Sequence, residues 1–450
     1  MKVIRLASLA LIWALAAPLH AQSYKVLVNF NGSYSPQEPG IIAQSRGGYL
    51  LSTAPDAAAD KPGVAFRVKT SGALTVLHQF DTREGIVPCG GLTLGRDGRF
   101  YGPIFNGGMN GYGAVFQMTP DGIVKILHEF TAEDDGFPFA PPIQSLYGDF
   151  YGTASGNPTH PGTIYKIDTD GGFTILHAFA GADGATPLAT LVQATNYWFY
   201  GTTLLGGTNG VGTIFRISAS GNFEVLFNFD GTHGSLPHAG LIQANDGNFY
   251  GVTYRGGKGN QGVVFRMTPM HQVTVLHDFT GGSDGSGPIG RLVQASDGYL
   301  YGTTYYGGAS GGGILFRIST TGEFTTLHHF QQSAGSNPIA LIQHTNGFLY
   351  GDTFSGGIAS RGVFYRFDLG QPPFVSYLPS YGRVGMPVDI LGERFTTYSQ
   401  VFFNGVRAQI ITVSPTYMRV VVPHGATSGW ITVTTTKGTL KSNKKFVVRP

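Results

Sequence analysis

Residues 297–318 read DGYLYGTTYYGGASGGGILFRI, and the local signals in this stretch predict the fold. Asp297 and Gly298 form a tight-turn pair, and the segment 299–305 that follows is rich in aromatic and β-branched residues, which favour a strand. A glycine-rich loop at 307–312 separates it from a second predicted strand at 313–318. The stretch therefore predicts a tight turn followed by two strands that a glycine-rich loop connects.

The tyrosine of this stretch, Tyr301, recurs at regular intervals along the chain. Its counterparts are Tyr101, Tyr151, Tyr200, Tyr250 and Tyr350, with Leu51 in a degenerate first copy. An aromatic residue of the next strand follows each of them by 14 or 15 residues: Phe66, Phe116, Tyr165, Phe215, Phe265, Phe316 and Tyr365. Successive tyrosines are 49 to 51 residues apart, so the chain contains seven copies of one structural unit.

Each copy contains four strand candidates, which we name a to d in chain order. Strand a is exemplified by 240–244 (GLIQA), strand b by 299–305, strand c by 213–217 and strand d by 273–279. The candidates are short, and Gly-containing turns separate them. Four strands in a unit of about 50 residues are typical of a propeller blade.

Strand d predicts how the ring closes. The segment after the seventh strand c, 363–367, contains no strand d, whereas an unpaired copy of strand d stands near the amino end at 24–30. An open solenoid would leave both ends as ragged edges that promote aggregation. We therefore predict an all-β fold with a seven-bladed β-propeller closed by an N-terminal strand. In that fold the longer b–c and d–a loops share one face, where we expect function.

The repeat resembles the bacterial tandem-repeat family called GloVer (gloeo/verruco) repeat proteins. The residues that carry the resemblance are Asp-Gly-x-Leu-Tyr-Gly-Thr-Thr, then Gly-Gly, then Gly-x-Ile-Phe-Arg, clearest at 297–317. The similarity covers roughly 24–367 and implies a repeat architecture but no particular activity.

The last 80 residues form a different module. The 50-residue rhythm ends at Gln371, Pro372 and Pro373, and seven short strands are expected at 374–378, 387–391, 400–403, 408–413, 417–422, 430–435 and 444–448. Such a series predicts an immunoglobulin-like β-sandwich. The segments 392–395, 401–406 and 422–433 resemble the IPT/TIG family, which implies a spacer, adhesive or sugar-associated module. The predicted domains are therefore a signal peptide at 1–21, the propeller at 22–370 and the IPT/TIG domain at 371–450.

The amino end predicts export. Lys2 and Arg5 precede an apolar run at 6–17, and a small residue, Ala21, marks the expected cleavage site. Cleavage lowers the formal charge from +3 to +1, which gives no field to attract nucleic acid. No second apolar run of spanning length follows. We expect a protein that is secreted, periplasmic or at the cell surface, with no transmembrane segment after cleavage and no cofactor.

Large side chains four residues after the tyrosine end strand b at the loop-rich face. They are Phe105, Leu204, Tyr254, Tyr305 and Phe354. Together with Arg255 and Tyr306, the aromatic members predict a site that stacks on a sugar or a polypeptide. Packing between blades is the alternative explanation for the same pattern.

Other patterns point to chemistry less specifically. The histidines of strand d, His78, His128, His177, His277 and His328, predict inter-blade packing, because Val28 and Phe227 occupy the same position. Asp134 and Asp135 are weak candidates for a Ca²⁺ site. A copper-radical oxidase needs a Cys cross-linked to a Tyr together with His ligands. Cys89, the only cysteine, and His233 and His238 are available for such a site, but no motif surrounds them.

We therefore predict a secreted, non-catalytic propeller that binds an extracellular carbohydrate or protein. One alternative is a secreted propeller enzyme acting on glycans, as a lyase, hydrolase or oxidase, with Asp134, Asp135 and Asp284 as candidate acids. Another is a structural component of the envelope or matrix.

Overall fold

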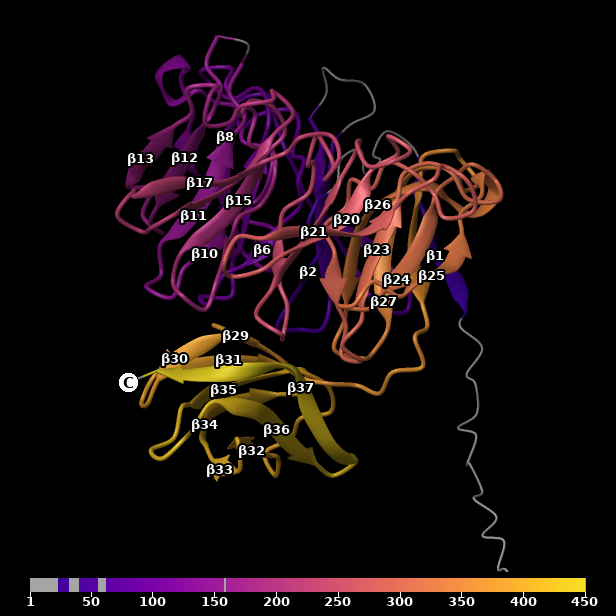
Figure 1. Ribbon diagram of the computed structural model, residues 1–450. Helices are drawn as coiled ribbons and strands as arrows, with labels where there is room; N and C mark the ends of the chain where they lie inside the picture. The colour runs from indigo at the N-terminus through magenta and orange to yellow at the C-terminus, as the bar shows by residue number, and fades with distance from the viewer. Residues whose placement is uncertain (1–22, 32–39, 56–61, 158, 450) are drawn as a thin grey trace, which may run out of the picture.

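The computed structural model describes residues 23–31, 40–55, 62–157 and 159–449. Within them, seven four-stranded antiparallel sheets form a propeller, and two further sheets form a C-terminal β-sandwich (Figure 1). The predicted fold class, a seven-bladed propeller followed by an immunoglobulin-like sandwich, is confirmed. The signal peptide predicted at 1–21 lies outside the described residues.

The blades follow the chain in order, each with strand a first. Blade 1 contains β2 (Ala43–Gln44), β3 (Leu50–Ala54), β4 (Val64–Val68) and β5 (Leu74–Gln79). Blade 2 contains β6 (Thr93–Leu94), β7 (Phe100–Ile104), β8 (Ala114–Met118) and β9 (Val124–Glu129). Blade 3 contains β10 (Ile143–Gln144), β11 (Phe150–Ala154), β12 (Thr163–Ile167) and β13 (Phe173–Ala178). Blade 4 contains β14 (Val192–Gln193), β15 (Phe199–Thr203), β16 (Thr213–Ile217) and β17 (Phe223–Asn228).

The later blades repeat this order. Blade 5 contains β18 (Ile242–Gln243), β19 (Phe249–Thr253), β20 (Val263–Met267) and β21 (Val273–Asp278). Blade 6 contains β22 (Val293–Gln294), β23 (Leu300–Thr304), β24 (Ile314–Ile318) and β25 (Phe324–His329). Blade 7 contains β26 (Ser336–Gln343), β27 (Leu349–Ser355) and β28 (Val363–Phe367), to which β1 (Tyr24–Asn29) is added. Two 3₁₀ turns, η1 (Ala132–Asp134) and η2 (Gln332–Ala334), lie in d–a loops.

The amino-terminal strand closes the ring. β1 pairs antiparallel with β28, with Val26 opposite Tyr365 and Val28 opposite Phe364. The predicted closure is therefore confirmed. The expected strand bounds need a correction in strand a, because only Ile242 and Gln243 of the segment 240–244 are paired with the next strand. Strand a of blade 7 is the exception, because β26 runs over eight residues.

The Tyr-Gly pair of strand b is explained by packing inside the blade. The glycine leaves space for the aromatic residue of strand c: a Cβ at Gly302 would lie 2.6 Å from Cζ of Phe316 and 2.7 Å from Cδ2 of Leu292. The tyrosine is buried, and the hydroxyl of Tyr301 donates a 2.7 Å hydrogen bond to Asp297 of the preceding turn. The turn, the tyrosine and the glycine of the repeat therefore form one packing unit.

The last residue of strand a links neighbouring blades, a role that the sequence analysis missed. The side-chain oxygen of Gln243 accepts a 3.0 Å hydrogen bond from the backbone N–H of Thr195 in the preceding blade. The same bond is made by Gln44, Gln144, Gln193, Gln294 and Gln343. Blade 2 has Leu94 at this position. The recurrence of Gln every 50 residues or so was the signal, because a buried amide needs a defined partner.

The C-terminal sandwich has two sheets. One contains β29 (Ser376–Leu378), β31 (Pro387–Leu391), β34 (Gln409–Ser414) and β35 (Tyr417–Val421). The other contains β30 (Tyr381–Arg383), β32 (Gln400–Phe403), β33 (Val406–Arg407), β36 (Gly429–Thr435) and β37 (Gly438–Arg449). Two short strands, β30 and β33, were not predicted, and the strand expected at 444–448 is only the end of the longer β37. Hydrophobic periodicity does not reveal strands of two or three residues.

The sandwich lies against the propeller face that carries the a–b turns, opposite the long loops (Figure 1). Asp389 accepts a 3.0 Å hydrogen bond from Arg46 of blade 1, and Arg419 donates a 2.7 Å bond to the carbonyl of Arg96 in blade 2. On the far side of the face, the rings of Tyr197 and Tyr381 meet edge to face at 5.2 Å. The sandwich therefore covers the lower end of the central channel.

In the described part of the chain, no helix has the length and hydropathy of a membrane-spanning segment.

Candidate functional site

Aromatic side chains gather on the loop-rich face over blades 5, 6 and 7. The rings of Tyr254 and Tyr306 both lie beside Gly287, and the ring of Tyr306 lies 4.7 Å from that of Tyr305. The ring of Tyr305 in turn lies 6.0 Å from that of Phe354. We call these four residues, together with Arg255, the aromatic patch. The structure therefore brings together five of the six residues that the sequence analysis selected.

The backbone holds the patch in position. Ser286 and Tyr306 exchange two backbone hydrogen bonds of 2.9 and 3.0 Å, which tie the end of strand b to the d–a loop of the preceding blade. Ser235 and Arg255 make the equivalent pair at 2.8 and 3.0 Å. Because these segments are clamped at both ends, the rings project from a rigid base rather than from a free loop.

The patch is accessible at its outer rings. Tyr306 is 46% exposed and Phe354 is 38% exposed, while Tyr254 and Tyr305 are partly buried beneath them. The guanidinium of Arg255 lies 4.8 Å from the centre of the Tyr254 ring, a cation–π arrangement. Burial, and next to it the neighbouring Tyr254, raise the pKa of Tyr306, so its hydroxyl stays protonated at neutral pH. The surface is thus apolar rings with neutral hydroxyl groups and one cation.

Phe105 does not belong to the patch. It lies on blade 2, where its ring contacts Phe137 at 5.5 Å and Phe139 at 5.7 Å. The position after strand b is equivalent in every copy, but neighbouring loops of blades 2 and 3 surround Phe105. For this residue, packing between blades explains the sequence pattern.

The histidines of strand d pack between blades, as predicted. His128 stacks on Phe173 of the next blade with ring centroids 3.7 Å apart, and its Nε2 lies 3.1 Å from the carboxylate of Asp134. The same double contact, a ring and an acid, recurs at His177 and His277. An acid six or seven residues after the histidine was the signal in the sequence for this pairing.

The candidate acids are engaged within their own blades. Asp134 accepts hydrogen bonds from the backbone and hydroxyl of Thr131, and Asp284 lies 3.1 Å from Nε2 of His277 on β21, the strand before its loop. Burial raises the pKa of Asp135, which has a left-handed backbone at φ 64°. No group of three His, Cys, Asp or Glu side chains suited to a metal ion occurs among the described residues. The Ca²⁺ site at Asp134 and Asp135 therefore stays a hypothesis that rests on two neighbouring carboxylates.

Two of the three residues considered for a copper-radical site, Cys89 and His238, both contact Phe139. The thiol of Cys89 is buried and lies 3.7 Å from the carbonyl oxygen of Phe139. The ring of His238 meets that of Phe139 at 6.1 Å, and burial lowers the pKa of His238 to about 4. His233 instead binds Asp230 at 2.9 Å. The two histidines therefore serve different local structures.

Structural comparison finds several solved proteins of low identity. PorZ, a surface component of the type-IX secretion system of Porphyromonas gingivalis, is 15% identical with a TM-score of 0.49; the match covers 94% of this chain, which spans 61% of PorZ. An oligogalacturonate lyase of Vibrio parahaemolyticus is 9% identical at TM-score 0.48, with 77% and 93% of the two chains covered. A fungal alcohol oxidase of the AA5 family is 13% identical at TM-score 0.48, with 93% and 98% covered. Scores below 0.5 support no functional conclusion.

Sequence comparison with curated proteins finds no match. Comparison with protein families gives two overlapping matches to the Gloeobacter/Verrucomicrobia repeat, at residues 15–215 and 197–382, and one to the IPT/TIG domain at 372–448. These matches span the seven blades and the sandwich. The chain therefore belongs to the Gloeobacter/Verrucomicrobia repeat family and ends in an IPT/TIG domain.

Proposed function

We propose that the protein is a non-catalytic binding protein that holds a carbohydrate on the aromatic patch, outside the cytoplasm. The observation that carries this proposal is the cluster of rings in which Tyr305 contacts both Tyr306 and Phe354, with Tyr254 and Tyr306 both beside Gly287. Flat apolar rings with neutral hydroxyl groups suit the C–H faces and hydroxyl groups of sugars.

The size of the patch favours a small ligand over a protein. An aromatic side chain has roughly 150–250 Å² of surface to bury, and the exposed fractions leave roughly 200 Å² or less available over the two outer rings, Tyr306 and Phe354. A stable protein interface needs about 800 Å² from each partner. A short oligosaccharide fits this area, whereas a protein partner would have to use much more of the loop-rich face.

Glycan-array binding followed by titration calorimetry tests the proposal. The variants Tyr306→Ala and Phe354→Ala remove exposed rings without opening the core, and Tyr398→Ala, in the sandwich and 84% exposed, is a matched control. We expect about tenfold weaker binding for each patch variant, because burying one ring contributes about 1–2 kcal/mol. The control should bind as the wild type does.

Three results would contradict the proposal. The first is glycan binding that both patch variants leave unchanged. The second is capture of an extended peptide by the patch with no glycan bound. The third is turnover of a polysaccharide by the purified protein, which would support the enzyme hypothesis instead.

A further inference from the structure

A cavity lies at the lower end of the central channel, between the propeller and the sandwich, on the face opposite the aromatic patch. Its volume is about 450 Å³. Six of the seven innermost strands contribute to its wall (β2, β6, β10, β18, β22 and β26), and β29, β31 and β37 of the sandwich complete it. The cavity therefore exists only because the two domains are docked.

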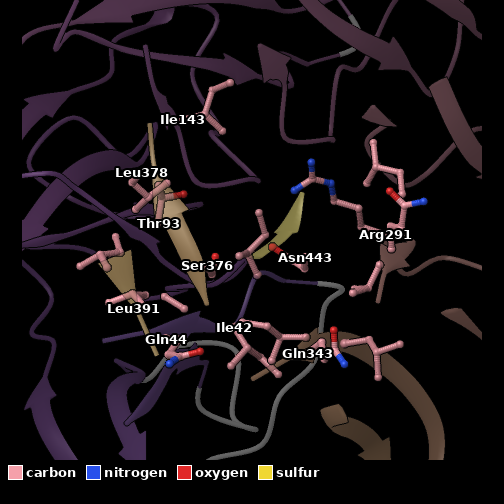
Figure 2. Close-up of a pocket in the computed structure, with 18 of the residues that line it drawn as sticks. Ile42, Gln44, Thr93, Ile143, Arg291, Gln343, Ser376, Leu378, Leu391 and Asn443 are labelled. Atoms are coloured by element: carbon pink, nitrogen blue, oxygen red, sulfur yellow. The ribbon is translucent and has the colours of Figure 1, made fainter. Parts of the chain in front are cut away.

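Two basic side chains line this cavity. Figure 2 shows the guanidinium of Arg291 extending from the propeller toward the strand that carries Asn443. Lys444, the residue after Asn443, also lines the cavity and lies close enough to Arg291 for the two charges to repel each other. The site thus brings together two cations that are 153 positions apart in the sequence.

Neither cation has a protein counter-ion. Nε of Arg291 donates a 3.3 Å hydrogen bond to the carbonyl of Leu241, but no hydrogen bond or ion pair to its Nη atoms, or to Nζ of Lys444, occurs among the described residues. The cavity wall contains no Asp or Glu. Unpaired cations held out of water are costly, and proteins normally pair them.

Burial lowers the pKa of both groups, as expected for cations without a counter-ion. Burial, with the charge of Arg291 as the second cause, lowers the pKa of Lys444 to about 8. Burial lowers the pKa of Arg291 to about 10. A bound anion would remove this penalty, because an opposite charge within reach favours the protonated form of each group.

The rest of the wall is mainly aliphatic. Ile42 and Ile143 line it from the propeller, and Leu378 and Leu391 line it from the sandwich (Figure 2). Ile242 of β18 is a further lining residue. The side-chain oxygens of Gln44, Gln294 and Gln343 already accept the hydrogen bonds between blades. The polar groups that remain, apart from the two cations, include the side chains of Thr93, Ser376 and Asn443. A ligand that matches this wall has one anionic end and an apolar body.

We propose that this cavity binds a small organic carboxylate, with its charged group between Arg291 and Lys444 and its apolar body against the isoleucine and leucine side chains. The volume lies within the range of ordinary small-molecule sites. Because both domains form the wall, the ligand would hold the sandwich against the propeller. This site is independent of the function proposed for the aromatic patch.

Titration calorimetry of the full-length protein with octanoate tests the proposal, with 1-octanol as the neutral analogue and acetate as the charged group alone. We expect saturable 1:1 binding of octanoate, with 1-octanol and acetate at least about tenfold weaker, the factor expected for losing a charge-assisted contact or the apolar contacts. Equal affinity for octanoate and 1-octanol, or no octanoate binding, would overturn it.

Variants distinguish the site from adventitious binding. Arg291→Thr introduces the residue that blade 4 has at the same position, Thr190, so the blade should fold normally. Lys444→Met removes the second cation, and Lys445→Met, at its exposed neighbour in β37, is the matched control. We expect about tenfold weaker octanoate binding for the first two variants. The control Lys445→Met should bind octanoate as the wild type does. Octanoate binding that neither cavity variant weakens would contradict the proposal.

Two further readouts separate a binding role from a structural one. In the absence of ligand, Arg291→Thr and Lys444→Met should raise the melting temperature, because each relieves an unpaired charge; a lower melting temperature would indicate that the cations support the interface instead. At pH 9, octanoate binding should take up protons in the wild type and not in Lys444→Met. Absence of proton uptake in the wild type would contradict the position proposed for the carboxylate.

Discussion

The ring of Tyr24 lies parallel to the imidazole of His328, with ring centroids 4.1 Å apart. In blades 2, 3 and 5 the ring stacked on the equivalent histidine belongs to strand d of the next blade: Phe173, Phe223 and Phe324. At the ring closure the amino-terminal strand supplies the stacked ring, Tyr24. The hydroxyl of Tyr24 also donates a 2.6 Å hydrogen bond to the backbone carbonyl oxygen of Ala334. Ala334 stands where other copies have the acid that binds the histidine.

Tyr24→Ala should weaken ring closure. The substitution removes a stacked ring, its hydrogen bond and its packing against Tyr365, so we expect a loss of about 3 kcal/mol in the free energy of unfolding. Denaturant titration followed by fluorescence measures the loss. Tyr24→Phe keeps the ring and should lose only about 1 kcal/mol. Equal stability of Tyr24→Ala and the wild type would contradict the role given to this stack.

Asp352 should make the propeller less stable as the pH rises. It is buried in β27 with one carboxylate oxygen lacking a partner among the described residues, and burial raises its pKa from 3.8 to about 7. Between these two pKa values the folded state therefore binds a proton that the unfolded state has lost. The stability that depends on this proton is fully present below pH 4 and is lost as the pH rises past 7. The shift corresponds to at most about 4 kcal/mol.

Asp352→Thr tests this, because Thr153, Thr202 and Thr303 occupy the same position in other blades. We expect the variant to melt at a higher temperature than the wild type at pH 8, and the difference to shrink or reverse at pH 4. The exposed Asp121→Asn is the control and should leave the pH dependence unchanged. A constant difference across this range would show that Asp352 is ionised in the folded protein.

His328 should make the propeller less stable as the pH falls, the reverse of the effect of Asp352. Burial, and then the nearby His329, lower its pKa from 6.5 to about 4, and its Nε2 has no hydrogen-bond partner among the described residues. The unfolded state therefore takes up a proton first, and stability is lost as the pH falls from above 6.5 towards 4. His328→Phe keeps a ring for Tyr24 and should reduce the fall in melting temperature between pH 7 and pH 4.5. An unchanged fall would contradict this assignment.

Asp389→Ala should undock the sandwich. Asp389 is buried and binds Arg46 of the propeller at 3.0 Å and Arg419 of its own domain at 2.6 Å, so its removal leaves two guanidinium groups without their carboxylate. Breaking a buried ion pair from one side costs about 3–5 kcal/mol. We expect faster proteolysis of the 371–373 segment and a larger radius of gyration in X-ray scattering.

The control for this experiment is Arg407→Ala, an exposed residue on the same domain that should leave both readouts unchanged. If the Asp389 variant keeps the wild-type radius and protease resistance, the contacts of Tyr197, Tyr381 and the other a–b turns are sufficient for docking.

The sequence alone determined the parts of the protein that repeat. Seven copies with a displaced strand d predicted the number of blades and the pairing of Val26 with the last sheet, because each strand, turn and packing glycine is specified by residues close to it in the chain. Only the tertiary structure showed which loop residues meet: Tyr254, Tyr306 and Phe354 share one patch, whereas Phe105, at the same repeat position, packs elsewhere. It alone also placed Arg291 beside Lys444, since the way two separately folded domains dock depends on their surfaces and not on any local pattern.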